Sequence, residues 1–101
     1  MSEYKPTDEC KTVVELLAST RRWFGGTRPG GMSRNCWCVD TAIDHVYRGG
    51  QRTAASKAFL KAAGLRASGD SYSRSVRIWD WNDAPERTHA EVLAAVRKAG
   101  I

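Results

Sequence analysis

The sequence lacks the segments that would tie the protein to a membrane or export it. No apolar run approaches the roughly 18 residues that a membrane-spanning helix needs. The opening stretch, MSEYKPTDECK, has neither a basic start nor an apolar signal region. We therefore expect a soluble, cytoplasmic protein that does not bind a membrane.

The chain also has too few cysteines for a disulfide framework. Its three cysteines are an odd number, and two of them, Cys36 and Cys38, are only two positions apart. That arrangement suits structural disulfides poorly. Free thiols in a reducing compartment fit the pattern better.

Motifs that hold a phosphate group or a metal ion are missing too. The stretch GGTRPGG is not followed by the Gly-Lys-Ser or Gly-Lys-Thr of a phosphate-binding loop. Cys36 and Cys38 lack the spacing of a structural zinc site, and in a helix they would point roughly 200° apart. His45 would lie about 10 Å along the helix from Cys38, and the other histidine, His89, opens a later helix. We expect no metal and no cofactor.

The chain has 101 residues, of which 42% are hydrophobic and 27% charged, a composition sized for one compact domain spanning residues 1–101. Residues 8–22 place apolar side chains at three- and four-residue steps, which predicts a helix with Thr7 as its cap. Residues 24–35 contain four glycines and one proline, which indicates a flexible or functional loop.

The second half of the chain predicts further helices. Residues 36–50 carry an apolar stripe after Asn35, a competent cap, and they end at two glycines. Residues 53–64 form a third helical pattern that stops at Gly64. Residues 71–79 alternate instead, which favours a short extended segment.

A last helix begins at Thr88, because Thr88 and Glu91 have the spacing of a capping box. The predicted fold is therefore mostly α, a small single-domain arrangement of four helices with a glycine-rich loop and one short extended segment.

The net charge of +5 is unevenly distributed. Residues 21–35 contain four arginines and no acid, and residues 48–77 contain seven basic residues against one acid. Arginine outnumbers lysine 11 to 5, and its guanidinium group favours paired contacts with phosphates or carboxylates. We therefore expect an acidic macromolecular partner, either nucleic acid or an acidic protein surface. The candidate partner-binding residues are Arg21, Arg22, Trp23, Arg28, Arg34, Lys57 and Lys61.

One alternative is enzymatic. The run NCW at a predicted helix start resembles the nucleophile position of papain-like cysteine hydrolases, with Cys36 as the thiol and His89 or His45 as the base. The resemblance covers about three residues. A buried thiol on a helix face is the preferred interpretation of Cys36.

The stretch WDWNDAPERTHAEV, residues 79–92, looks like a site but is better interpreted as a structural clasp. Asn82 and Asp83 are turn formers, and Arg87 is placed to pair with Asp83. In an extended segment, Trp79 and Trp81 would point to the same side and cover the core. The residues assigned to this clasp are Trp79, Trp81, Asn82, Asp83, Arg87, Thr88 and Glu91.

The same stretch, with CWCVDTAI before it, is similar to a family of small uncharacterised proteins of bacteria and their phages. Six residues match the family's Trp-Asn-Asp-x-Pro-x-Arg-Thr motif: Trp81, Asn82, Asp83, Pro85, Arg87 and Thr88. The resemblance implies no activity. It implies a setting in which small basic proteins dock on a host macromolecule, including as inhibitors of host defence systems.

We therefore expect a small non-enzymatic binding protein of phage or mobile-element type. The alternatives are a nucleic-acid-binding accessory protein and a cysteine-dependent hydrolase that uses Cys36.

Overall fold

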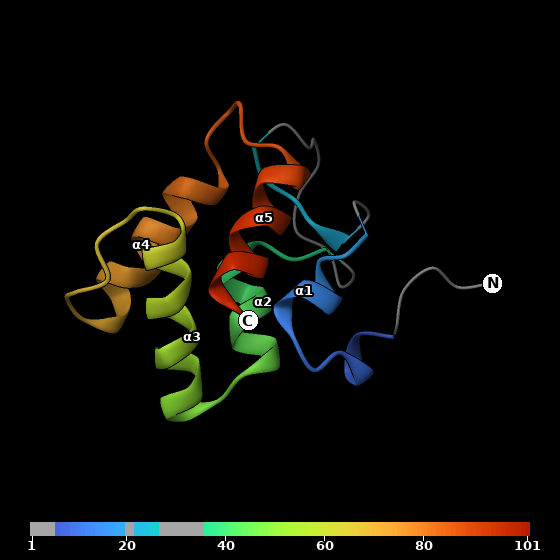
Figure 1. Ribbon diagram of the computed structural model, residues 1–101, viewed down its shortest axis with the longest axis horizontal. Coiled ribbons are helices and arrows are strands. Elements are labelled where there is room, and N and C mark those ends of the chain that lie inside the picture. Colours follow the sequence, from blue (N-terminus) through green and yellow to red (C-terminus); the bar gives the residue numbers. More distant parts are fainter. Residues whose placement is uncertain (1–5, 20–21, 27–35) are drawn as a thin grey trace.

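The protein is mostly helical, as the sequence predicts. The computed structural model describes residues 6–19, 22–26 and 36–101. Its elements are the 3-10 helix η1 (Thr7–Glu9) and the α-helices α1 (Val13–Leu16), α2 (Val39–Val46), α3 (Gly49–Ala62), α4 (Ser71–Asn82) and α5 (His89–Ala99) (Figure 1). Within these described ranges no helix is long and apolar enough to cross a membrane.

The helix α3 organises the packing, because it contacts α5, α4 and α2. In Figure 1, α5 lies along one side of α3 and α4 passes along another. The short α1 packs against α2 and α5. One apolar core lies between these helices, and its largest fully buried side chains include Trp23, Phe59, Leu16, Ile43 and Ile78.

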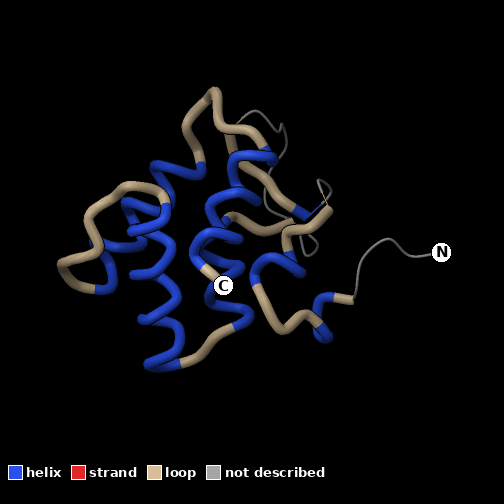
Figure 2. The backbone as a smooth tube through the Cα atoms, in the orientation of Figure 1, coloured by secondary structure: helices blue, strands red, loops and turns tan. Residues whose placement is uncertain are grey.

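Residues 71–79 form most of α4, so the prediction of an extended segment is wrong (Figure 2). The side chain of Asp70 caps the helix by accepting from the Ser73 amide at 2.8 Å. The same hydrogen bond holds the pKa of the Asp70 carboxyl below its usual value. The buried positions of α4 are Ser75, Ile78 and Asn82, which are spaced as one helix face. Two of the three are polar, so the apolar pattern of a helix is hidden in the sequence.

The prediction of a single helix over residues 8–22 is also wrong. The chain makes the single turn η1 and then the four-residue α1. Thr12 rather than Thr7 caps α1, because its hydroxyl accepts from the Glu15 amide at 3.0 Å. Cys10, Val13 and Leu17, which belong to the apolar pattern of this segment, are nevertheless buried.

The next two helices exist but have different starts. Cys38 is the N-cap of α2, in a capping box with Thr41, whereas the predicted cap, Asn35, lies outside the described residues. The helix α3 begins at Gly49, four residues before the predicted Thr53. It ends beside Gly64 as predicted.

The capping box of α5 is confirmed. The Thr88 hydroxyl accepts from the Glu91 amide at 3.2 Å, and the Glu91 carboxylate accepts from the Thr88 amide at 2.9 Å. The helix ends at Gly100, whose φ of 73° lies in the left-handed region.

The Asn82 side chain joins three separate parts of the chain. It is fully buried, and its Oδ1 accepts from the Trp23 indole N–H at 2.8 Å and from the Val39 amide at 3.1 Å. Its Nδ2 donates to the Phe24 carbonyl at 3.0 Å and to Asp83 Oδ1 at 2.9 Å. All four hydrogen bonds of a carboxamide are therefore made.

Gly25 allows the main chain to pass very close to the side-chain amide of Asn82. Its φ is 133°, a conformation that other residues rarely adopt. A Cβ atom at this position would overlap Asn82 Nδ2 and would also crowd the Asn82 carbonyl oxygen. Glycine is therefore required by conformation and by space.

We predict that Asn82→Ala lowers the free energy of unfolding by about 3 kcal/mol. The substitution strands the Trp23 and Val39 donors in the interior, and each such loss costs about 1 kcal/mol or more. Guanidinium denaturation measures the change. The matched control is the exposed Asp80→Ala on the same helix, which should change stability by less than about 0.5 kcal/mol. A loss below about 1 kcal/mol for Asn82→Ala would contradict this role.

A second prediction compares two glycines. Gly25→Ala should lower stability by on the order of 2 kcal/mol, because the new methyl group displaces the Asn82 amide. Gly50→Ala should raise stability by about 0.5 kcal/mol, because Gly50 is helical and a Cβ there meets nothing within 4 Å. Thermal and denaturant unfolding of the two variants give the comparison. Equal effects of the two substitutions would show that no close approach exists at Gly25.

Candidate functional site

The two tryptophans of the 79–92 stretch do not form a lid on one side of the core. They lie on α4, where positions two apart point in different directions. Trp79 is 38% exposed and donates its indole N–H to Asp40 Oδ2 at 2.9 Å. Trp81 packs edge-on against Phe59 of α3, with ring centroids 5.2 Å apart. The lid prediction fails because the segment is helical.

Arg87 has different partners from the one expected. Its Nε donates to the Trp81 carbonyl at 2.9 Å, and its guanidinium carbon lies 3.8 Å from the centroid of a Trp81 ring. Its ion pair is with Glu91, at 3.5 Å. The expected partner, Asp83, instead accepts a hydrogen bond from the side-chain Nδ2 of Asn82. Every one of these contacts holds the α4–α5 connection in place, which supports the structural interpretation of the stretch.

The helix start that was expected at Cys36 belongs to Cys38. Cys38 is buried, and its sulfur accepts from the Thr41 amide at 3.5 Å as the N-cap of α2. Cys36 is partly exposed and lies three residues before the first residue of α2. Cys36 is therefore not at the start of α2, the position that the comparison with papain-like hydrolases assigned to it.

In both histidines the Nε2 atom lies within hydrogen-bond distance of a main-chain carbonyl oxygen. His89 Nε2 lies 2.7 Å from the Leu17 carbonyl oxygen, and His45 Nε2 lies 3.2 Å from the Thr7 carbonyl oxygen. A carbonyl only accepts, so each Nε2 carries the proton. In the parts of the chain that the structure describes, no three His, Cys, Asp or Glu side chains are grouped as metal ligands.

Two of the seven candidate partner-binding residues are core residues. Trp23 is 1% exposed and Arg22 is 5% exposed, and an Arg22 Nη1 donates to Cys10 Sγ at 3.6 Å. Assigning them to an exposed basic surface was therefore wrong. The sequence did not reveal this because the partner that buries Trp23, Asn82, lies 59 positions away. Arg21, Arg28 and Arg34 lie outside the described residues.

Lys57 and Lys61 are exposed on α3, one helical turn apart. The buried residues of α3 are Ala55, Ser56, Phe59 and Leu60, so the lysines point away from the core. Neither lysine forms an ion pair with a described residue.

The arginines nearby are already engaged within the protein. Arg52 forms an ion pair with Asp44 at 2.7 Å, and Arg48 donates to the carbonyl of the same residue. Arg74 donates to the Gly69 carbonyl, and Arg77 donates to two carbonyls of the α3–α4 connection. These arginines stabilise the α2–α3 and α3–α4 connections, whereas the two lysines have no such partner among the residues that the structure describes.

Two hollows lie one after the other along the contact between α3 and α5, and the sequence analysis predicted neither. The larger measures about 360 Å³ and is lined by Tyr47, Gln51, Ala54, Ala55, Ala58, Ala99, Gly100 and Ile101. The smaller measures about 300 Å³ and is lined by Ala62, Ala63, Trp81, Arg87, Glu91, Ala94, Ala95 and Lys98. The available signal was the run of alanines on both helices, since short side chains leave space between helix backbones.

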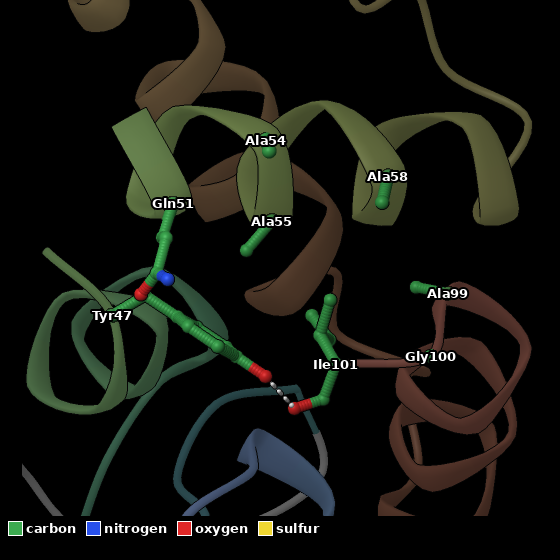
Figure 3. Close-up of a pocket in the computed structure, with 8 residues that line it drawn as sticks. All are labelled: Tyr47, Gln51, Ala54, Ala55, Ala58, Ala99, Gly100 and Ile101. Atoms are coloured by element: carbon green, nitrogen blue, oxygen red, sulfur yellow. Dashed lines mark hydrogen bonds between the residues drawn. The ribbon is translucent and has the colours of Figure 1, made fainter. Parts of the chain in front are cut away.

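A hydrogen bond holds two of the residues that line the larger hollow, Tyr47 and Ile101, together. Figure 3 shows Ala55 of α3 and Ile101 facing it from different sides. The Tyr47 hydroxyl donates to the Ile101 carbonyl at 2.9 Å, and burial raises the pKa of this phenol. The hollow is therefore built on residues that are themselves anchored.

Comparison with known proteins gives a family but no activity. Neither the curated proteins nor the solved structures include a match to this chain. The family match covers residues 1–100, nearly the whole chain. The resemblance noted for the 79–92 stretch is thereby confirmed in its main point, that the relatives are uncharacterised. The protein belongs to the family of unknown function DUF6197.

Proposed function

We propose that this protein is a non-enzymatic binding protein that docks on an acidic macromolecule through the outer face of α3. The observation that carries the proposal is the exposed pair Lys57 and Lys61, which have no acidic partner among the described residues. A neighbouring exposed arginine, Arg66, extends the positive charge into the α3–α4 connection.

Within the part of the chain that the structure describes, these lysines form no contact that holds the fold. They lie on the face of α3 opposite its buried residues, whereas the arginines at 48, 52, 74 and 77 hold local structure. Exposed charges of one sign raise the rate of encounter with an oppositely charged partner and fix its orientation.

The non-enzymatic part of the proposal draws on the cysteine and histidine geometry. Cys36 is outside the first turn of α2, and the Nε2 atoms of His45 and His89 are committed to main-chain carbonyls. These contacts favour a binding role over the cysteine hydrolase considered from the sequence.

The setting of a phage or mobile element remains part of the proposal, with inhibition of a host defence system as one form of docking. It draws on the resemblance and on the compact, basic character of the chain. Arg21, Arg28 and Arg34 are proposed as further contacts on the grounds of sequence charge alone.

The proposal predicts that Lys57→Glu/Lys61→Glu lowers partner capture from a lysate of the source organism by on the order of tenfold or more. The tagged full chain serves as bait, and retained protein and nucleic acid are quantified with and without nuclease. Circular dichroism and thermal unfolding should be unchanged, because both positions are exposed.

The matched control is Lys11→Glu/Arg97→Glu, which makes the same charge change at two exposed positions away from this face of α3. Capture should survive in the control. Equal capture by the two double variants, or no retained material with the wild type, would refute the docking surface. Capture that nuclease abolishes would identify the partner as nucleic acid.

A further inference from the structure

The contact between α3 and α5 forms a shallow apolar groove. The two helices run antiparallel. Ala54 and Ala58 of α3 line the same hollow as Ala99 at the end of α5, whereas Ala62 at the end of α3 lines the same hollow as Glu91 near the start of α5. Both hollows therefore open along the same helix pair. Alanine predominates on both walls, so the groove has an apolar floor with unfilled space above it.

We infer that this groove receives an amphipathic helix of an acidic protein partner. The inference rests on the proposed function and deepens it, because it chooses protein over nucleic acid. An amphipathic helix binds a groove of this kind by inserting apolar side chains at positions i, i+3 or i+4, and i+7.

The spacing of the hollows matches such a helix. On α3 the first hollow is lined by residues between Gln51 and Ala58 and the second by Ala62 and Ala63, so residues seven apart, such as Ala55 and Ala62, line different hollows. Seven residues of helix span roughly 10 Å, which is the separation of side chains at i and i+7 on a partner helix. Two large apolar side chains of the partner would then fill the two hollows.

The charges around the groove select an acidic helix. Lys61 follows the groove residue Ala58 by one helical turn, and the exposed Lys98 lines the second hollow from α5. The one acid in the lining, Glu91, is already paired with Arg87. The rims therefore carry unmatched positive charge on both sides.

The same lining disfavours nucleic acid. Half of the residues that line the two hollows are alanines, which offer no ring on which bases stack. The one aromatic residue of the first hollow, Tyr47, is held by its hydrogen bond to the Ile101 carbonyl. The one aromatic ring of the second hollow, Trp81, is already covered by the Arg87 guanidinium. An apolar floor gives phosphate groups nothing to bind.

The probe is a fluorescent helical peptide of about 18 residues with leucines at i, i+3, i+4 and i+7 positions and glutamates on its flanks. Binding to the full chain is followed by fluorescence anisotropy. A peptide of the same composition in scrambled order and a 20-base-pair DNA duplex serve as the other arms. The wild type should bind the ordered peptide at least about tenfold more tightly than the scrambled one.

Two variants fill the hollows. Ala54→Trp and Ala94→Trp add a large side chain at exposed positions of the first and second hollow. Each should raise the Kd for the ordered peptide at least about tenfold. The matched control is Ala90→Trp, also exposed on α5 but outside both hollows, and it should leave the Kd unchanged. Circular dichroism confirms that the three variants fold.

The outcomes separate this inference from the proposed function. If Ala54→Trp and Ala94→Trp bind the ordered peptide as well as the control does, the groove is not the site. If the duplex binds and the peptide does not, with loss of duplex binding in Lys57→Glu/Lys61→Glu, the docking function stands and the groove inference fails. A dimer of this chain that Ala54→Trp disrupts would assign the groove to a second copy and would also overturn the inference.

Discussion

The buried carboxamide of Asn82 is the interaction on which the rest of the structure depends. It is the last residue of α4, and its hydrogen bonds reach the segment around Trp23, the first residue of α2 and its own neighbour Asp83. A buried amide is stabilising only when every donor and acceptor is satisfied. Here three of the four hydrogen bonds join Asn82 to chain segments 43 to 59 positions away. The amide therefore specifies one arrangement of the helices rather than adding to a general apolar attraction.

This arrangement explains how the polar residues of the 79–92 stretch serve the fold, although the stretch looks like a site in the sequence. Three of its polar side chains are turned inward or toward neighbouring residues: Asn82 to the core, Arg87 to Trp81 and Glu91, and Thr88 to the start of α5. Polar groups in the interior must be paired, so a cluster of them is conspicuous in the sequence whether or not it has a function. The surface that we propose for a partner is the outside of α3 and its contact with α5, where lysines and alanine-lined hollows lie.

Local signals in the sequence predicted local structure well. The capping box at Thr88, the stop at Gly64 and the mostly helical class follow from interactions within a few residues. The errors that concern burial share one cause, which is contact between distant residues. Ser75 and Asn82 are buried polar residues, so α4 was interpreted as an extended segment. Trp23 and Arg22 were assigned to the surface because their burial depends on partners 59 and 12 positions away. The alanine-lined hollows arise from the pairing of two helices, which no pattern within either helix specifies.

The central claim is that Asn82 fixes the start of α2 to the end of α4. Amides at the first position of a helix have no acceptor within the helix, and they ordinarily exchange with solvent quickly. Val39 occupies that position in α2 but donates to Asn82, whereas His89 occupies it in α5 and its amide has no acceptor among the described residues. Native-state hydrogen exchange measured by NMR is the most direct test. The account predicts that the Val39 amide exchanges only through global unfolding while the His89 amide exchanges rapidly; comparably fast exchange at both positions would contradict it.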